Sequence, residues 1–563
     1  METETAERVE KTGKAAWGRW MILAGLTAWF AYDLVRTLLY AVESWGLPGA
    51  FDAMVLLRLG ELLAFVPLAV YLLVVANNPA FFRRARWVMA AGALLAGVSY
   101  FGLQGRIAWA PLALLVAFLA LLAALVSGVR RGRAARLLPW FGFGYLILMH
   151  LLVDLSGLLF HGYAVVPYPA PYPAQAETAA EQRQADARYL GSELARLHKN
   201  AFHTMTEPEY WDELARLEAA APALSDAQFN LEMMRFVASV GDAHTSLLLG
   251  DAAGLHSLPL IFRWFGPDLH VHAASDDYAH ILGARVVAIG SLPAEDVYQA
   301  VLPYISHEND AWARVQSRQY LHIVELLAQA GAVDGMGPVA LTVENQSQET
   351  ITLDVVPLEP GEQVDFQTAR QEQPYYLSQP DLPFWYEYRP ESRTLYFRYA
   401  ACVDPLGFYQ TANEFWKIVE EQPVDRLIFD LRDNGGGNTF QFDQFFWPRL
   451  WDHPELNDPQ RLIVLIDGVT FSSASKHAVD FAERTSATLV GEPTGGKPNG
   501  YGEVRSFRLP YSRAQVFYST NYFQTMPEDP PSVMPDVLIY APAEAIYSGQ
   551  DPVLETAAPD EDW

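Results

Sequence analysis

The chain has 563 residues and a formal net charge of −27, and both figures limit what it can be. A single hydrophobic core rarely grows beyond about 250–300 residues, so two or more domains are expected. The negative charge is concentrated after residue 164, and a surface this acidic repels nucleic acid. Cys402 is the only cysteine, which excludes an internal disulfide framework and any multi-cysteine metal site.

Residues 1–164 contain five apolar stretches, which predict an α-helical membrane domain of about five spans. Each stretch has about the length that a helix needs to cross ~30 Å of hydrocarbon; they cover 17–42, 54–77, 86–104, 108–129 and 137–161. Lysine and arginine are concentrated before the first stretch, between the second and third, and between the fourth and fifth. The positive-inside rule then makes the N-terminus cytoplasmic, and five crossings place the rest of the chain outside the cytoplasm. We therefore expect a multi-pass protein of the cell membrane.

The next two segments predict a linker and a helical region. Residues 165–179 are rich in proline, which favours an extended spacer. Within residues 180–254, Ser225 and Gln228 have the spacing of a capping box, and apolar residues then return every three or four positions. A polar sequence, Asp-Ala-His-Thr at 242–245, follows this predicted helix directly.

The remaining sequence divides into a β-rich part and an α/β part. Residues 255–360 alternate short β-rich runs with one predicted helix after Pro293. Residues 361–563 mix strands and helices, and two buried strands, 426–432 and 461–467, each run into a turn.

The two turns contain the residues best suited to catalysis or ligand binding. The first is DLRDNGGG (430–437), where glycines allow backbone N–H groups to approach a ligand closely. It is not a P-loop, because no Gly-Lys-Ser/Thr follows. The second is GVTFSSAS (468–475), which opens a predicted helix, and a serine in this place is usually only a helix N-cap. A third motif, LVGEPTGGK (489–497), follows another strand.

The three motifs DLRDNGGG, TFSSAS and LVGEPTGGK, in this order, resemble those of the tail-specific, or C-terminal processing, peptidases. Relatives of that family include the tricorn protease core and the repeats of interphotoreceptor retinoid-binding protein. The resemblance covers about residues 180–545. It implies a helical N-terminal part (180–254), an inserted PDZ-like module (255–360) and a crotonase/ClpP-like α/β peptidase core (361–563). The implied activity is that of a membrane-anchored serine endopeptidase acting on extracytoplasmic or membrane proteins.

The resemblance also implies roles for particular residues. Ser473, the first serine of Ser-Ala-Ser-Lys, takes the place of the acyl-forming nucleophile. Backbone N–H groups of Gly436 and Ala474 would line the oxyanion hole.

The family uses two kinds of general base, and the sequence offers both. Lys497 fills the place of the lysine used by processing peptidases, and His244 matches the histidine of tricorn-like members. The ordinary pKa of histidine, ~6.5, suits a base without tuning, whereas a lysine must be buried. A histidine base also needs a carboxylate to orient it, for which Glu503 is the first candidate and Glu528 the second.

A second functional class stays open, because the retinoid-binding relatives keep this fold without catalysis. The chain would then be a non-catalytic protein that binds a peptide or another ligand. No cofactor and no metal site is expected, since the histidines lack HExxH or similar spacing. The expected partners are a protein or peptide substrate and the membrane, with no nucleic acid, and the sequence leaves the oligomeric state undetermined.

Overall fold

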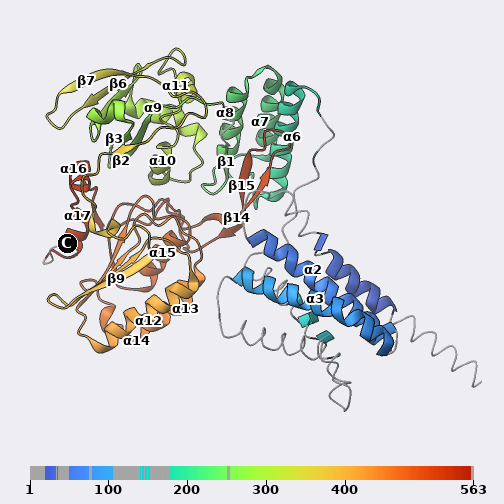
Figure 1. Ribbon diagram of the computed structural model, residues 1–563. Helices are drawn as coiled ribbons and strands as arrows, with labels where there is room; N and C mark the ends of the chain where they lie inside the picture. Colours follow the sequence, from blue (N-terminus) through green and yellow to red (C-terminus); the bar gives the residue numbers. More distant parts are fainter. Residues whose placement is uncertain are drawn as a thin grey trace, which may run out of the picture. The chain divides into compact units, whose positions relative to one another are not determined.

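The computed structural model describes most of the chain after residue 175 and separate segments before it. The described residues are 20–32, 34–35, 50–74, 79–104, 140, 143–144, 146–148, 150–151, 172, 176–249 and 254–559. The chain divides into two units, Met1–Tyr168 and Pro169–Trp563, each of which packs internally (Figure 1).

Helices form the described part of the first unit. α2 (Ala50–Ala69) continues as a short π-helix, η1 (Val70–Val74), and α3 (Pro79–Gln104) packs against α2. Arg58 donates to Glu61 one turn later at 3.0 Å. Both side chains are buried in the middle of α2.

The prediction of a five-span membrane domain is wrong for the helices that the structure describes. None of these helices combines the length and the apolar character that a membrane crossing needs. The charged pair within α2 is one physical reason, because ionised side chains are costly in hydrocarbon. The predicted span 108–129 lies outside the described residues. The expected extracytoplasmic location depended on the same spans.

The second unit begins with three helices, each opened by a capping box. They are α6 (Ala179–Leu197), α7 (Glu207–Ala220) and α8 (Asp226–Ala238). The capping box predicted from Ser225 and Gln228 is confirmed at the start of α8. Apolar side chains of the three helices share one core with a small antiparallel sheet, whose strands in order are β1 (Ser246–Leu248), β15 (Gln515–Phe523) and β14 (Gly500–Arg508).

The β-rich part folds into an antiparallel sheet with three helices, and the predicted helix after Pro293 is confirmed. The sheet strands are β2 (Leu260–Phe265), β3 (Asp268–Ala274), β4 (Arg285–Ile289), β5 (Leu292–Pro293), β6 (Val339–Glu344), β7 (Thr350–Val355) and β8 (Gln367–Thr368). The helices are α9 (Ala294–Val301), α10 (Asp310–Ser317) and α11 (Val324–Gln329).

A six-stranded sheet forms the centre of the remaining α/β part. Its strands in spatial order are β16 (Val537–Leu538), β13 (Thr488–Gly491), β12 (Leu462–Ile466), β11 (Arg426–Asp430), β10 (Thr394–Tyr399) and β9 (Phe384–Arg389). All neighbours are parallel except β10 and β9. The two strands predicted at 426–432 and 461–467 are β11 and β12, which are neighbours, so the turns after them meet at one edge.

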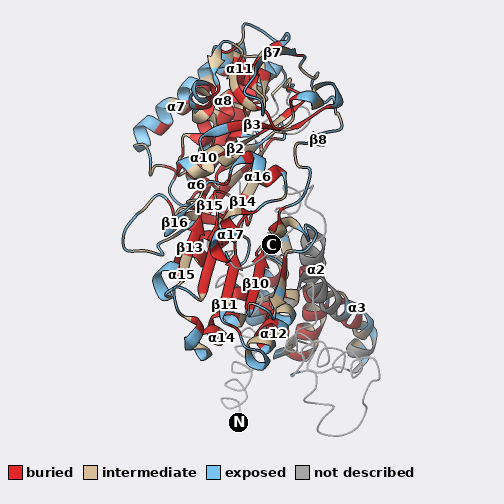
Figure 2. Cartoon of the chain, turned by 90° about the vertical axis from the view of Figure 1, so that its left-hand side faces the viewer, coloured by how far each residue is buried: buried red, intermediate tan, exposed pale blue. Residues whose placement is uncertain are grey.

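Helices cover both faces of this sheet, and its central strands are buried on each side (Figure 2). The helices on one face are α12 (Pro405–Glu421), α13 (Phe440–Phe445), α14 (Trp447–Asp452) and α15 (Ser473–Arg484). On the other face lies α17 (Pro552–Ala557), which follows α16 (Ala543–Tyr547). The α/β character expected for residues 361–563 is therefore present.

A buried ion-pair network fixes the start of the turn DLRDNGGG (430–437), which we call the glycine turn. Arg432 donates to Asp551 Oδ1 at 2.7 Å and to Asp430 Oδ2 at 2.6 Å, and all three residues are almost inaccessible. Arg398 donates to the carbonyl of Arg432 at 2.6 Å. Because buried charges need such complete pairing, the network holds the turn after β11 in one position against the sheet.

Candidate active site

The turn between β12 and α15 forces one serine into a strained backbone conformation. Ser472 has φ 52° and ψ −122°, a region that residues with a side chain avoid. A sharp turn from a strand into a helix is also the arrangement that exposes the nucleophilic serine of α/β-hydrolases. The strain at Ser472 therefore marks this position within the serine-rich turn.

His244 lies against that serine. Its Nε2 is 3.0 Å from Ser472 Oγ, although the two residues are 228 positions apart in the sequence. His244 comes from the loop between α8 and β1, and its ring packs 4.5 Å from the ring of Phe471. The structure thus brings the predicted histidine to a serine one position before the predicted nucleophile.

Ser473 is turned the other way. Its hydroxyl donates to the carbonyl of Gly437 at 2.7 Å, and the side chain is buried. This contact ties the first turn of α15 to the glycine turn. A hydroxyl held in this way is not directed at His244, whereas the neighbouring Ser472 hydroxyl is.

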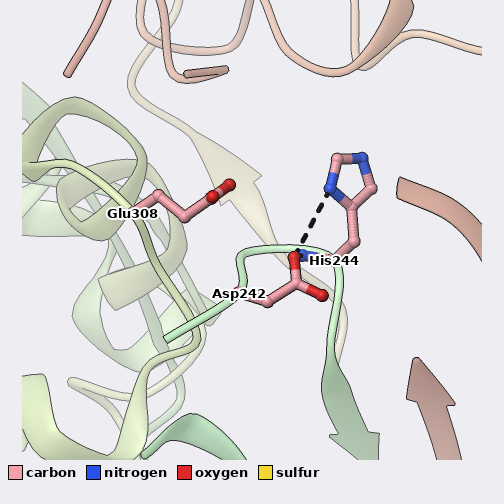
Figure 3. Close-up of side chains that lie close together, drawn as sticks. All are labelled: Asp242, His244 and Glu308. Atoms are coloured by element: carbon pink, nitrogen blue, oxygen red, sulfur yellow. Dashed lines mark hydrogen bonds and ion pairs between the residues drawn. The ribbon is translucent and has the colours of Figure 1, made fainter. Parts of the chain in front are cut away.

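Asp242 provides the carboxylate beside the histidine. Its Oδ1 lies 3.8 Å from His244 Nδ1 and accepts the backbone N–H of His244 at 2.9 Å (Figure 3). Its Oδ2 lies 3.0 Å from His198 Nε2 and also accepts the hydroxyl of Thr245 at 2.5 Å. Burial alone would raise the pKa of Asp242, but its hydrogen bond to His198 and the nearby histidines outweigh burial and lower that pKa. Asp242 is therefore an anion next to the imidazole.

Glu308 is a second carboxyl group at this place. It precedes α10, and its carboxyl oxygen, the Asp242 oxygen and the His244 nitrogen all lie within 4.8 Å of one another. Figure 3 shows its side chain extending towards the space beside the other two residues. Burial, followed by the charge of Asp242, raises the pKa of Glu308 to about 8. Glu308 is thus largely protonated at neutral pH.

The histidine itself is tuned by its surroundings. Burial lowers the pKa of His244, the charge of Asp242 opposes that shift, and Lys476 adds to it. The imidazole is therefore neutral at pH 7, which is the state that accepts a proton. The three groups Asp242, His244 and Glu308 could also offer ligand atoms to a cation, but a proton held by Glu308 already relieves the repulsion between the two carboxyl groups.

The glycine turn closely approaches the serine-rich turn at 468–475. A Cβ at Gly436 would lie 2.6 Å from Ser472 Cβ and 2.8 Å from the backbone nitrogen of Ser473, so only glycine fits. The predicted oxyanion-hole donors are both engaged: Gly436 N–H donates to Asn434 Oδ1 at 2.9 Å, and Ala474 N–H donates to the Phe471 carbonyl at 3.0 Å. The Ser473 N–H has no acceptor among the described residues.

The other predicted site residues make contacts with residues other than Ser472 and His244. Lys497 Nζ pairs with Asp529 Oδ2 at 2.8 Å. The Glu503 carbonyl accepts the Thr520 hydroxyl at 2.7 Å, and the Glu503 carboxylate acts electrostatically on Lys476 rather than on His244. The Glu528 carbonyl accepts from Asn499 Nδ2 at 2.5 Å. The structure therefore unites His244 with Asp242 and Ser472, and gives Lys497, Glu503 and Glu528 other neighbours.

Comparison with known proteins gives similarity only at the level of solved structures. No family model and no curated protein matches the chain. A structure of mature CPAF complexed with lactacystin is 13% identical, with 66% of this chain and 95% of that chain covered and a TM-score of 0.45. A photosystem II D1 C-terminal processing protease is 14% identical over 67% and 99%, with a TM-score of 0.31, and the tricorn protease is 14% identical over 69% and 37%, with a TM-score of 0.33. All three TM-scores are below 0.5, so the function must be inferred from the geometry of the site itself.

Glu308 leads to a prediction about stability and pH. Its pKa is about 8 in the folded chain and about 4.3 when unfolded, so the folded state binds the extra proton between these values. Stability should therefore fall as the pH rises through this window. Glu308→Gln keeps a neutral group, and we expect it to raise the free energy of unfolding by about 5 kcal/mol at pH 8.5 and by only about 1 kcal/mol at pH 5.

Urea unfolding at the two pH values measures this difference. Glu391→Gln, which replaces an exposed glutamate, is the matched control and should show no pH-dependent gain. An equal effect of Glu308→Gln at pH 5 and pH 8.5 would contradict the raised pKa.

Proposed function

We propose that the chain is a serine peptidase with Ser472 as its nucleophile and His244 as its general base. The observation that carries this proposal is the 3.0 Å contact between Ser472 Oγ and His244 Nε2 at a strained strand-to-helix turn. A base within hydrogen-bond reach of an otherwise weak nucleophile is the basic requirement of covalent acyl transfer. Asp242 completes the arrangement as the group that orients the imidazole.

The proposed reaction follows the acyl-enzyme route. His244 Nε2 takes the proton of Ser472 while Oγ bonds to the carbonyl carbon of the scissile peptide. The tetrahedral intermediate then collapses, the C–N bond breaks, and His244 gives its proton to the leaving amine. Water repeats the sequence on the acyl-enzyme, which releases the second product and restores Ser472. Asp242, as an anion, favours the tautomer with the proton on Nδ1 and stabilises the transient imidazolium.

The developing oxyanion needs hydrogen-bond donors, and the Ser473 N–H is our first candidate. In strand-to-helix nucleophile turns the residue after the nucleophile supplies one such donor. This N–H lies beside Gly436 and has no acceptor among the described residues. Moving the nucleophile from Ser473 to Ser472 therefore moves this oxyanion donor from Ala474 to Ser473. Such a donor contributes roughly 3–4 kcal/mol to transition-state stabilisation.

A lysine base fits the geometry less well. Lys497 Nζ is ion-paired with Asp529 Oδ2 at 2.8 Å, and no described contact joins it to Ser472 or Ser473. Proteins or peptides are the proposed substrates, because the neutral His244 and the turn geometry serve amide hydrolysis directly.

Labelling with a fluorophosphonate tests the proposal. The full-length protein should be modified at one serine, and peptide mapping by mass spectrometry should identify it as Ser472. Ser472→Ala should abolish labelling, and Ser473→Ala should retain it. A folded wild-type protein that stays unlabelled would instead support the non-catalytic, ligand-binding alternative.

A further inference from the structure

One carboxylate, that of Asp467, binds both turns of the proposed active site. It directly follows β12 and accepts the backbone N–H of Asp433, at the start of the glycine turn, with both oxygens at 3.1 Å. It also accepts the N–H of Val469 at 3.0 Å and the N–H of Thr470 at 2.9 Å. Both belong to the turn 468–475 that contains the proposed nucleophile, which we call the nucleophile turn. The Thr470 hydroxyl is a further contact at 3.1 Å. No other side chain in the described part of the chain accepts backbone N–H groups from both turns.

The distance between these two turns determines the geometry of the site. The nucleophile Ser472 and the donor N–H of Ser473 belong to one turn, and Gly436, which packs against both, belongs to the other. Only a few further contacts cross from turn to turn, such as the N–H of Phe471 to the Asn434 carbonyl at 3.0 Å. A small shift between the turns would therefore move the oxyanion donors relative to the attacking oxygen, and a displacement of about 1 Å can cost ~100-fold in rate.

Asp467 lines a cavity that Ser472 and His244 do not line. The cavity has a volume of about 730 Å³, and its walls include Gly468, Val469 and Glu492. Asp467 can thus exchange protons with solvent in this cavity.

The charged neighbours of Asp467 come from several elements. Asp433 and Arg432 belong to the glycine turn, Arg263 to β2, and Glu492 to the turn after β13. Burial, followed by the charge of Asp433, raises the pKa of Asp467 to about 6, while the two arginines oppose the shift. Below about pH 6 the carboxylate therefore becomes a neutral acid, which accepts hydrogen bonds less strongly.

We propose that Asp467 is a positioning residue that fixes the distance between the glycine turn and the nucleophile turn. It thereby fixes the position of the oxyanion donors relative to Ser472. This inference rests on the proposed peptidase function for its catalytic part. Its structural part, the joint fixation of the two turns, can be measured without any activity.

Asp467→Asn is the test, because an amide has one accepting oxygen and presents an NH₂ group to donors that need an acceptor. We expect amide hydrogen exchange to become faster in both turns, at 433–437 and at 468–472. We also expect kcat to fall by about 10–100-fold with KM changed less than about 2-fold, since the cavity at Asp467 is lined by neither Ser472 nor His244.

The pH profile distinguishes a positioning role of Asp467 from a nonspecific loss of structure. In the wild-type protein, both His244 and Asp467 gain a proton as the pH falls, so log kcat should decline with a slope approaching two. Asp467→Asn should decline with a slope of one, because only His244 still titrates. Glu492→Gln is the matched control: it removes a carboxyl group that lines the same cavity but binds neither turn, and it should change neither exchange nor kcat by more than about 2-fold.

Each outcome decides the proposal. Unchanged hydrogen exchange in Asp467→Asn overturns it whatever the activity, and faster exchange with unchanged kcat overturns its catalytic part. An equal loss in Glu492→Gln also overturns it. If Asp467→Asn does not fold, Thr470→Val removes the hydroxyl that contacts Asp467 Oδ1, contacts the Leu431 carbonyl and accepts the Asp467 N–H. We then expect kcat to fall by about 3–10-fold, with faster exchange in both turns. A wild-type protein without peptidase activity contradicts the proposed function, and hydrogen exchange still tests the fixation of the turns.

Discussion

Ser472→Ala should lower kcat for peptide cleavage by a factor on the order of 10⁴ or more, whereas Ser473→Ala should lower it by less than about 10-fold. The first change removes the atom that forms the acyl bond. The second removes only the hydrogen bond from Ser473 Oγ to the Gly437 carbonyl and leaves the Ser473 N–H in place. The two serines are adjacent and chemically identical, so each variant is the matched control of the other.

Steady-state kinetics of both variants, together with circular dichroism to show intact folding, measures this difference. A peptide substrate whose cleavage releases a fluorophore makes the assay sensitive enough to measure a 10⁴-fold loss of activity. The reverse order, with Ser473→Ala inactive and Ser472→Ala active, would assign the nucleophile to Ser473. Loss in both variants to the same extent would show that the hydroxyl of Ser473 is also required, for example to align the glycine turn.

His244→Ala should lower kcat by a factor on the order of 10³–10⁴, and Lys497→Met should lower it by less than about 5-fold. The histidine is the group that contacts Ser472 Oγ, whereas the lysine is paired with Asp529 at 2.8 Å. Exposed ion pairs contribute only about 0–1 kcal/mol to stability, so Lys497→Met should remain folded.

The pH dependence gives an independent check on the base. Because burial lowers the pKa of His244, the acid limb of kcat/KM should lie below pH 6.5 and activity should persist through neutral pH. A lysine base would instead require activity to rise well above pH 7 as the ammonium loses its proton. An inactive Lys497→Met variant beside an active His244→Ala variant would reverse the assignment.

The fold of the second unit was largely predictable because its signals are local. The capping box at Ser225 and the two buried strands before the turns were correct to within two residues, since periodicity and caps depend on neighbours in sequence. For the described helices of the first unit, apolar length was misleading, because polar side chains such as Arg58 and Glu61 interrupt the pattern. A run of apolar residues shows that a segment avoids water, and it does not show whether lipid or protein covers it.

The sequence was sufficient to predict which segments form the site, but not which serine and which carboxyl groups lie beside His244. TFSSAS presents two serines at the start of one helix, and the choice depends on the backbone angles of Ser472, which spacing does not determine. Asp242 stands two residues before His244, and this spacing was the available signal for the carboxylate that we propose to orient the imidazole. Glu308 offered no signal, because a single glutamate before a helix becomes part of the site only through tertiary packing.

The wide sequence separation of the histidine and the serine has a consequence for how the cell makes this protein. The ribosome synthesises His244 first and Ser472 only 228 residues later, so the contact between them cannot form before both residues have been made. A partly synthesised chain thus holds a base without a nucleophile. The proposed peptidase would therefore have no active form that could cut its own unfolded segments before Ser472 has been synthesised.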